Sequence, residues 1–400
     1  MNGLFSSRRG HYWTLFVCTI THVFVHLFTF MHIALIPVFM AEFGLSIFES
    51  GLLASIPLVL SVFISLPYGL FTDRVDPRKL IAASLLLSGF SGLALSQATD
   101  FFTLLLPLMF ISLSSTLYHP PTLTIVSELL PSSQRNRALG IHGAGGTSGI
   151  AIGPITLGIV LGTFGWRFAY LVWVFPVLLS SLFLLKLPKI STPPNLGRRL
   201  RTGSETPRED QPSKALRYGY IVLLVAMSVN GIGGQSVSTY MTAYLVSNRG
   251  LTESMASLVF GLSPFIGILG SLSGGYLADF FGSKRWMTVA YLGSLLTLAG
   301  MYLGPLWTLI LLYLMGGYFG GSTMGPSSSL VAEFSPRKRR GLAYTIFMLP
   351  FSLMGAISPV IAAKIIELYE IQALFPFAIS LSLVSILILQ LLPKRAKTSQ

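Results

Sequence analysis

Twelve apolar runs, each long enough to cross a bilayer, dominate this 400-residue sequence. A membrane-spanning helix needs about 20 mainly apolar residues, because the hydrocarbon core is about 30 Å thick. The runs leave too little chain for a soluble catalytic domain. The predicted spans cover residues 12–41, 49–71, 80–98, 102–126, 138–163, 167–187, 218–246, 254–278, 286–304, 306–331, 342–364 and 371–392. We therefore expect an all-α membrane protein of twelve helices.

Composition and motif content narrow the functional class further. Only 10% of the residues are charged, against about 25% in soluble domains. The first run is too long for a signal-peptide core and is not followed by a small-residue cleavage site, so we expect it to stay as a functional helix. Cys18 is the single cysteine, which excludes disulfides and cysteine-ligated metal sites. HExxH, GxSxG and phosphate-binding loop motifs are absent from the sequence. We expect no enzyme activity, no ATP-driven transport, no cofactor and no metal.

The basic residues predict the orientation in the membrane. With the N-terminus in the cytoplasm, all of the 27 lysines and arginines except Arg167, Arg249 and Lys364 fall on the cytoplasmic side. The positive-inside rule then places both termini in the cytoplasm. Because these charges are spread over all the inner loops, they indicate contact with a lipid bilayer and argue against nucleic-acid binding. We expect a monomer in a prokaryotic-type inner membrane.

The two halves of the sequence repeat each other. Gly69 and Asp73 recur 206 positions later as Gly275 and Asp279, and the basic pair Arg78-Lys79 is matched at the same offset by Lys284-Arg285. Glu128, Pro131 and Arg135 recur 205 positions later, and each set follows the same span of its half. The polar stretch between the halves, rich in Pro, Ser and Arg, predicts a flexible cytoplasmic linker. The predicted domains are an N-terminal six-helix bundle (1–187), the linker (188–216) and a C-terminal six-helix bundle (217–400).

At these repeated residues the chain resembles the major facilitator superfamily, whose signature loop follows the second helix of each half. The copy beginning at Gly69 has Asp76-Pro77 where the signature has Gly and a basic residue, whereas the second copy keeps Gly282. The pair His119-Pro120 and the glycine-rich segment from His142 to Pro154 resemble the fosmidomycin-resistance type of drug exporter. This resemblance implies alternating access and favours export.

Two sets of residues are candidates for conformational switching. Carboxylates at the C-terminal ends of helices oppose the helix dipole, so they need basic partners, and the duplication favours a gate network over solvated loop charges. Glycines four residues apart allow close helix packing in lipid, and the resemblance implies that the fifth and eighth helices meet across the halves. The proposed gate comprises Gly69, Asp73, Arg74, Arg78, Lys79, Glu128, Arg135, Asp279, Lys284, Arg285, Glu333 and Arg340, and the packing set comprises Gly145, Gly149, Gly153, Pro154, Gly270 and Gly274.

Polar residues inside the spans are candidates for substrate binding or proton coupling. No Asp or Glu lies in the middle of any span, but histidines do, and ionisable intramembrane residues are functional candidates by default. His32 is interpreted as a packing residue. The seventh and tenth spans carry polar residues beside glycines that predict helix breaks at 231–234 and 316–321. The candidates are His22, His26, His119, His142, Asn230, Gln235, Tyr240, Tyr244 and Tyr318.

The sequence therefore predicts a secondary active transporter, proton-coupled and exporting a small organic compound or drug. The resembling exporters tend to carry an Asp in the first helix where this chain has His26, so both a histidine relay and an uncoupled carrier fit this position. Two alternatives stay open. One is a facilitator or symporter for a small anion or nutrient, and the other is a membrane sensor derived from a transporter.

Overall fold

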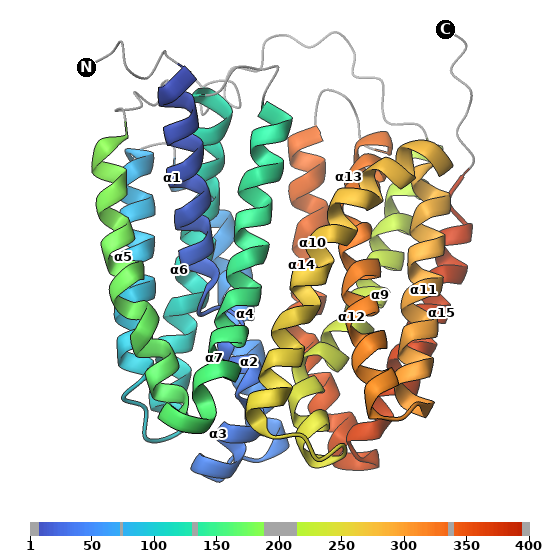
Figure 1. Cartoon of the computed structure of the whole chain (residues 1–400). Coiled ribbons are helices and arrows are strands. Elements are labelled where there is room, and N and C mark those ends of the chain that lie inside the picture. Colours follow the sequence, from blue (N-terminus) through green and yellow to red (C-terminus); the bar gives the residue numbers. More distant parts are fainter. Residues whose placement is uncertain (1–7, 73–74, 130–134, 188–213, 335–339, 394–400) are drawn as a thin grey trace, which may run out of the picture. The chain divides into compact units, whose positions relative to one another are not determined.

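The computed structural model describes residues 8–72, 75–129, 135–187, 214–334 and 340–393, and these ranges are helical with short connections and no strand. Figure 1 shows the helices running roughly parallel or antiparallel within each half of the chain. Their bounds are α1 Arg8–His26, α2 Met31–Ala34, α3 Ile36–Phe43, α4 Ile47–Phe71, α5 Pro77–Leu95, α6 Phe101–Leu129, α7 Arg135–Ser180, η2 Ser181–Lys186, α9 Lys214–Ser247, α10 Glu253–Phe281, α11 Ser283–Leu303, α12 Leu306–Ser322, α13 Met324–Glu333, α14 Arg340–Tyr369, η4 Ile371–Ala373 and α15 Leu374–Gln390.

The helices account for the twelve expected spans. Ten stretches of the described chain are long and apolar enough to cross a membrane. One of them, 138–186, contains two helices, because Gly165 interrupts α7 with a φ of 76°. The tenth predicted span is a further crossing, which is divided into α12 and α13.

The packing of the described chain divides it into two compact units. The first comprises the described residues up to 187 together with 241–262, and the second comprises 214–240 together with 263–393. The predicted linker lies almost wholly in the range 188–213, outside the described residues. The last turns of α9 and the first part of α10 therefore pack with the first unit.

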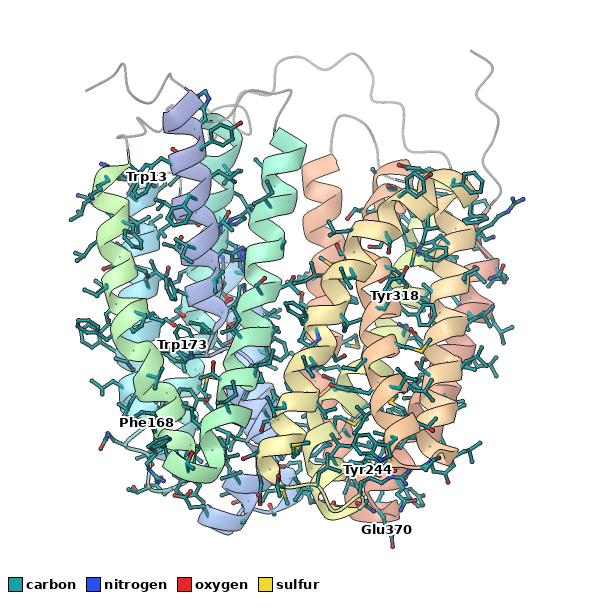
Figure 2. The ribbon with its side chains drawn as sticks, viewed as in Figure 1. Trp13, Phe168, Trp173, Tyr244, Tyr318 and Glu370 are labelled. Atoms are coloured by element: carbon teal, nitrogen blue, oxygen red, sulfur yellow. The ribbon has the colours of Figure 1, made fainter. Side chains whose placement is uncertain are left out.

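Large apolar side chains cover the outward faces of both units (Figure 2). Phe102 is 75% exposed, Phe175 68% and Leu303 80%. Water would penalise surfaces of this kind, whereas lipid tails solvate them. The exposed apolar side chains are those expected of an integral membrane protein.

A polar corner holds the turn between the two helices of α7. Trp166 and Arg167 follow Gly165, and both side chains bind Glu42 of α3: the indole nitrogen at 2.7 Å and the guanidinium at 2.6 Å. Arg167 also donates to the Ala98 carbonyl and lies over the Trp166 ring. Glycine is suited to this corner because its φ falls in the left-handed region, which other residues rarely adopt.

Candidate functional site

The first membrane span is broken at the level of its histidines. α1 ends at His26, and residues 27–30 form a turn before α2 begins. In the turn, the Leu27 and Thr29 amides donate to carbonyls three residues earlier, at 3.4 and 3.1 Å. The span predicted over 12–41 is therefore divided into α1, α2 and α3, a division that the sequence did not indicate. Broken helices inside a membrane are a recurring feature of transporter binding sites.

The glycine stripe of α7 lies directly against α1. Side-chain atoms added to Gly145, Gly149 and Gly153 would collide with the backbone carbonyls of Thr19, Val23 and Leu27, respectively. Both series advance by four residues, so the two helices stay in register and their backbones touch. The expectation that this stripe faces the eighth span was wrong. Other glycines make that contact: Gly158 meets Ser254 and Leu258, and Gly261 meets Ala151 and Ile155.

On α6, two prolines follow the histidine and remove backbone donors. Pro121 has no amide hydrogen to give to the Leu117 carbonyl, four residues earlier. The Tyr68 hydroxyl of α4 donates to that carbonyl instead, at 2.7 Å. Inside a membrane an unsatisfied carbonyl costs several kcal/mol. Because the Tyr68 hydroxyl takes the place of the missing amide donor, the Leu117 carbonyl is satisfied and α6 remains helical through Pro120 and Pro121.

Tyr118 joins α6 to α1 next to the histidines. Its hydroxyl donates to the Cys18 carbonyl at 2.7 Å and bonds with the Thr21 hydroxyl at 2.8 Å. Its ring stacks on His22 with a centroid distance of 5.3 Å. Tyr118 is fully buried. Tyr118 was not among the predicted site residues, although it directly precedes His119 in the sequence.

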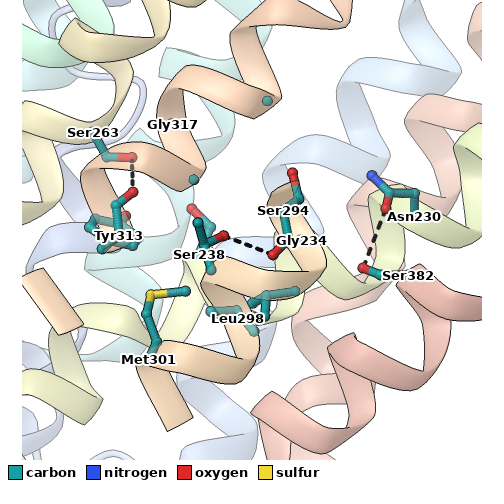
Figure 3. Close-up of a pocket in the computed structure, with 14 residues that line it drawn as sticks. Asn230, Gly234, Ser238, Ser263, Ser294, Leu298, Met301, Tyr313, Gly317 and Ser382 are labelled. Atoms are coloured by element: carbon teal, nitrogen blue, oxygen red, sulfur yellow. Dashed lines mark hydrogen bonds between the residues drawn. The ribbon is translucent and has the colours of Figure 1, made fainter. Parts of the chain in front are cut away.

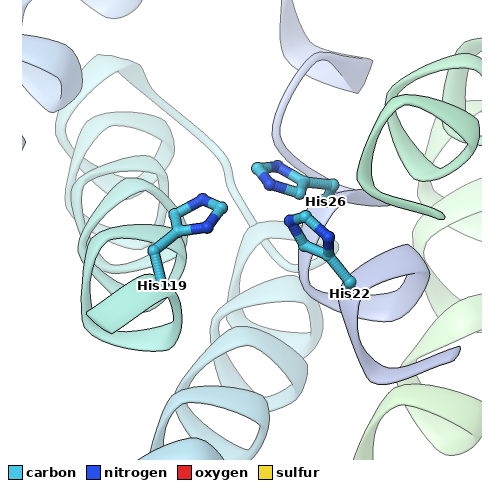
Figure 4. Close-up of side chains that lie close together, drawn as sticks. All are labelled: His22, His26 and His119. Carbon is cyan, nitrogen blue, oxygen red and sulfur yellow. The ribbon is translucent and has the colours of Figure 1, made fainter. Parts of the chain in front are cut away.

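Four of the predicted site residues gather in one place, which we call the histidine cluster: His22, His26, His119 and His142. The ring centroids of His22, His26 and His119 lie 4.9 to 5.2 Å apart. Figure 4 shows these three rings, two from α1 and one from α6, facing a common space. His142 of α7 stacks on His22 at 4.1 Å. The sequence predicted that His22, His26 and His119 act together. His142 joins the cluster by stacking its ring on His22.

Hydrogen bonding fixes the tautomer of His22. Its Nδ1 lies 2.7 Å from the His142 carbonyl oxygen, which can only accept, so Nδ1 carries the proton. The other nitrogen, Nε2, is buried and has no hydrogen-bond partner among the described residues. Gly146 leaves room for this ring, since a Cβ there would lie 2.5 Å from His22 Cε1 and 2.6 Å from Nε2.

The cluster contains imidazole as its only ionisable chemistry. His22 and His26 are 6% and 9% exposed, and His119 is partly exposed. His26 Nδ1 lies 3.4 Å from the Thr29 hydroxyl. Within the described part of the chain, no carboxylate is among the contacts of the four rings. His32 lies apart in α2 and is buried, in agreement with its interpretation as a packing residue.

The second unit contains a separate cavity of about 220 Å³ (Figure 3). None of its lining residues is charged. Ser382 donates to Asn230 at 3.4 Å, and Ser263 donates to the Tyr313 carbonyl at 3.3 Å. The lining comes from α9, α10, α11, α12 and α15: Asn230, Gly234, Val237, Ser238, Ser263, Ser294, Thr297, Leu298, Met301, Tyr313, Gly316, Gly317, Gly320 and Ser382.

The structure places the other predicted binding residues outside that lining. Gln235 donates to Thr239 on its own helix, at 3.4 Å. Tyr240 is fully buried, and the Tyr244 hydroxyl accepts from Arg249 at 2.9 Å. The Tyr318 hydroxyl bonds with Ser273 at 2.9 Å. Of the predicted set, Asn230 alone lines the cavity.

The glycines of the second unit serve close packing more than helix breaking. α9 runs unbroken through residues 231–234, so the break predicted there was wrong. The predicted interruption of the tenth span does occur, but at Thr323, after the glycines. Gly270 and Gly274 of α10 lie against the backbone of Tyr318 and Ser322 on α12.

The predicted gate residues are only partly within the described structure. Asp73 and Arg74 lie outside it, as do the side chains of Glu128, Arg135 and Arg340. Asp279, Arg285 and Glu333 are exposed, as is Lys79. The gate network thus stays a prediction.

Arg78 and Lys284 are described, and each bonds inside its own unit. Arg78 pairs with Asp76 at 2.7 Å and donates to the Leu187 carbonyl at 2.8 Å. Lys284 donates to the carbonyls of Gln390 and Leu392 at 2.9 and 2.8 Å. The two residues therefore occupy equivalent places, each binding the C-terminal end of the last helix of its half, where a cation also complements the helix dipole.

Comparison with known proteins places this geometry in context. The sequence model described as Major Facilitator Superfamily matches residues 18–300 and, in a second match, 223–400. The chain is 26% identical to the cis,cis-muconate transport protein of Acinetobacter baylyi over 76% of this chain and 75% of that protein. It is 23% identical to the fosmidomycin resistance protein of Escherichia coli, with 98% and 96% covered. A solved structure of a bacterial homologue of the human lysosomal transporter Spinster, inward-facing and occupied, matches with a TM-score of 0.78 at 15% identity, with 96% and 97% covered.

Proposed function

Because the chain belongs to the major facilitator superfamily, we propose that this transporter exports a small organic compound in exchange for protons by alternating access. The histidine cluster is the proposed coupling site, and the cavity of the second unit is the proposed substrate site. We further propose that the protein works as a monomer in a prokaryotic-type inner membrane, with both termini in the cytoplasm.

The observation that carries the proposal is the histidine cluster itself. Imidazole is the side chain whose unperturbed titration range lies nearest to neutral pH. The three rings around the common space are about 5 Å apart, a distance at which two positive charges repel strongly outside bulk water. Such a group is suited to taking up one proton at a time, and no carboxylate lies among its described contacts to do so instead.

The substrate class follows from the cavity lining and from the relatives. Hydroxyl and amide groups without a fixed charge suit neutral or anionic molecules better than permanent cations. The relatives named for cis,cis-muconate transport and fosmidomycin resistance suggest two compounds, cis,cis-muconate and fosmidomycin, that can serve as probes. The name of the second relative favours export.

The coupling proposal is tested with purified protein in proteoliposomes under an imposed pH gradient, with fosmidomycin and cis,cis-muconate as probes. We expect His26→Gln and His119→Gln to abolish gradient-driven accumulation while exchange without a gradient continues. His32→Gln, a buried histidine outside the cluster, is the matched control. Accumulation at the wild-type level in both cluster variants would remove the histidines from the coupling mechanism.

The substrate site is tested by thermal shift of the detergent-purified protein with the same two probes. Asn230→Ala should reduce the stabilisation by a bound probe, because Asn230 lines the cavity. Gln235→Ala, on the same helix but outside the lining, should keep it. An equal loss in both variants would place the substrate elsewhere.

A symporter of organic anions is the second candidate, and the muconate relative supports it. The direction of coupling separates the two functions. A proton gradient that drives probe movement with the protons indicates symport, whereas movement against the protons indicates export by exchange.

A further inference from the structure

We propose that His22, His26 and His119 form a binding site for a divalent transition metal ion. One ring nitrogen from each of the three residues lies within 4.8 Å of the other two. Metal binding at these three residues is independent of the transport function proposed above.

The ligand set suits zinc-like metals. Neutral imidazole is a preferred ligand of Zn²⁺, Co²⁺, Ni²⁺ and Cu²⁺, whereas Mg²⁺ and Ca²⁺ prefer oxygen. Three protein ligands with an open fourth position are typical of reactive zinc sites. Three histidines from two helices, His22 and His26 on α1 and His119 on α6, provide that number.

The distances fit an empty site that closes on its ion. Zn–N bonds of about 2.0–2.1 Å in a tetrahedral arrangement place the nitrogens about 3.4 Å apart. The separations of up to 4.8 Å therefore have to shrink by about 1.4 Å at most. Rotation of an imidazole about its side-chain torsions covers such a distance, and His26 is the last residue of α1, directly before the turn.

His22 is already oriented as a metal ligand. Ligating histidines usually donate their other ring N–H to a backbone carbonyl or a carboxylate, which fixes the tautomer and raises the basicity of the free nitrogen. His22 Nδ1 makes this bond to the His142 carbonyl at 2.7 Å. The remaining nitrogen, Nε2, is buried without a hydrogen-bond partner in the described chain. A buried, unsatisfied lone pair is unfavourable, and a metal ion satisfies it.

The charge of the site indicates what fills the fourth position. Three neutral imidazoles leave a bound dication with its full charge, and no carboxylate is among the described contacts of the rings. An uncompensated charge is costly in a low-dielectric surrounding. We therefore expect the ion to bring an anion, such as chloride or hydroxide, as its fourth ligand. His119 is partly exposed, so the site is reachable.

The test is metal binding to the purified, tag-free full chain, with Zn²⁺ titrated by calorimetry and Co²⁺ by its visible absorption. We expect one ion per chain and the intense Co²⁺ absorption bands of four-coordinate geometry. His22→Gln, His26→Gln and His119→Gln should each lower the affinity at least about tenfold, the smaller of the losses seen when even an outer partner is removed.

Two controls keep the outcome decisive. The first is His32→Gln, which replaces a buried histidine outside the cluster and should bind Zn²⁺ like the wild type. In the second, a melting transition of each variant without metal shows that it is folded, and Zn²⁺ should raise the melting midpoint of the wild type but not of the three ligand variants. Wild-type protein that binds no Zn²⁺, or variants that all bind equally, would overturn the proposal. Metal binding without proton-driven transport would refute the proposed function alone.

Discussion

Tyr118 and Tyr170 are both fully buried in the first unit, but their hydroxyls differ. The Tyr118 hydroxyl bonds with the Cys18 carbonyl and with Thr21, whereas the Tyr170 hydroxyl has no hydrogen-bond partner in the described structure. Removing one partner of a buried hydrogen bond costs about 1–3 kcal/mol. Removing a hydroxyl that has no partner costs little.

We therefore expect Tyr118→Phe to lower the melting midpoint of the detergent-purified protein, and Tyr170→Phe to leave it unchanged or raise it. The free energy of unfolding should fall by about 1–2 kcal/mol in the first variant. A larger loss in Tyr170→Phe than in Tyr118→Phe would contradict the expected order and would mean that the Tyr170 hydroxyl is hydrogen-bonded.

Gly146 and Gly143 form a second matched pair, both on α7. A methyl group at Gly146 would lie within 2.5–2.9 Å of three atoms of the His22 ring, whereas no atom of the described chain lies within 4 Å of one at Gly143. Overpacking of this kind costs about 1–3 kcal/mol, while alanine in a helix favours folding over glycine.

Gly146→Ala should therefore destabilise the protein in a thermal melt and displace His22, and Gly143→Ala should not. Histidine NMR signals from selectively labelled protein would report the displacement of the ring. Equal melting midpoints for the two variants would show that His22 does not occupy the position against Gly146.

At the scale of the helices, the sequence predicted where spans lie better than where they break. One of the two predicted breaks was placed at the glycines 231–234, yet α9 is continuous there. The real break follows His26 in a Leu-Phe-Thr-Phe segment that contains neither glycine nor proline. Glycine is a weak signal inside lipid, because small residues also serve close packing. Near the α1 break, the carbonyls of Val23 and Leu27 lie against Gly149 and Gly153 of α7, and no local sequence pattern reveals these contacts.

Hydrogen exchange separates the two segments. Backbone amides in peptides covering 26–31 should exchange faster than those covering 230–235, since the broken segment has weaker, three-residue hydrogen bonds. The glycine content alone would give the opposite order. Mass spectrometry of the detergent-purified protein after deuterium labelling measures both peptides in one experiment, and faster exchange at 230–235 would contradict the α1 break.

At the scale of the whole chain, the apolar runs were enough to predict the helical fold, because each span must satisfy its own backbone hydrogen bonds. The resemblance to the family came from the residues that repeat between the two halves. The site was predictable in part. His22, His26 and His119 stand out as ionisable residues at similar depth, whereas Ser263, Ser294 and Thr297 of the second cavity are ordinary helix residues in the sequence. Only the packing of five helices brings them together.

The orientation of the chain in the membrane is a further prediction at this scale. A cysteine replacing Asn248, which is exposed beside Arg249, should react with an impermeant thiol reagent added outside intact cells. Cysteines placed at 195–210 should not react. Cys18 is fully buried, so the wild-type chain gives a low background. Labelling of 195–210 from outside would reverse the topology.

The equivalent bonds of Arg78 and Lys284 have a consequence for the energy landscape of transport. Each bond closes within one unit, on the carbonyls of Leu187 in the first and of Gln390 and Leu392 in the second. If the units move as rigid bodies, these bonds are present in every conformation, and their free energies cancel when two conformations are compared. They make each half stiff without favouring either state. Ligands and weaker contacts then set the ratio of the two conformations. When the two conformations are close in free energy, small changes in these interactions shift their populations strongly.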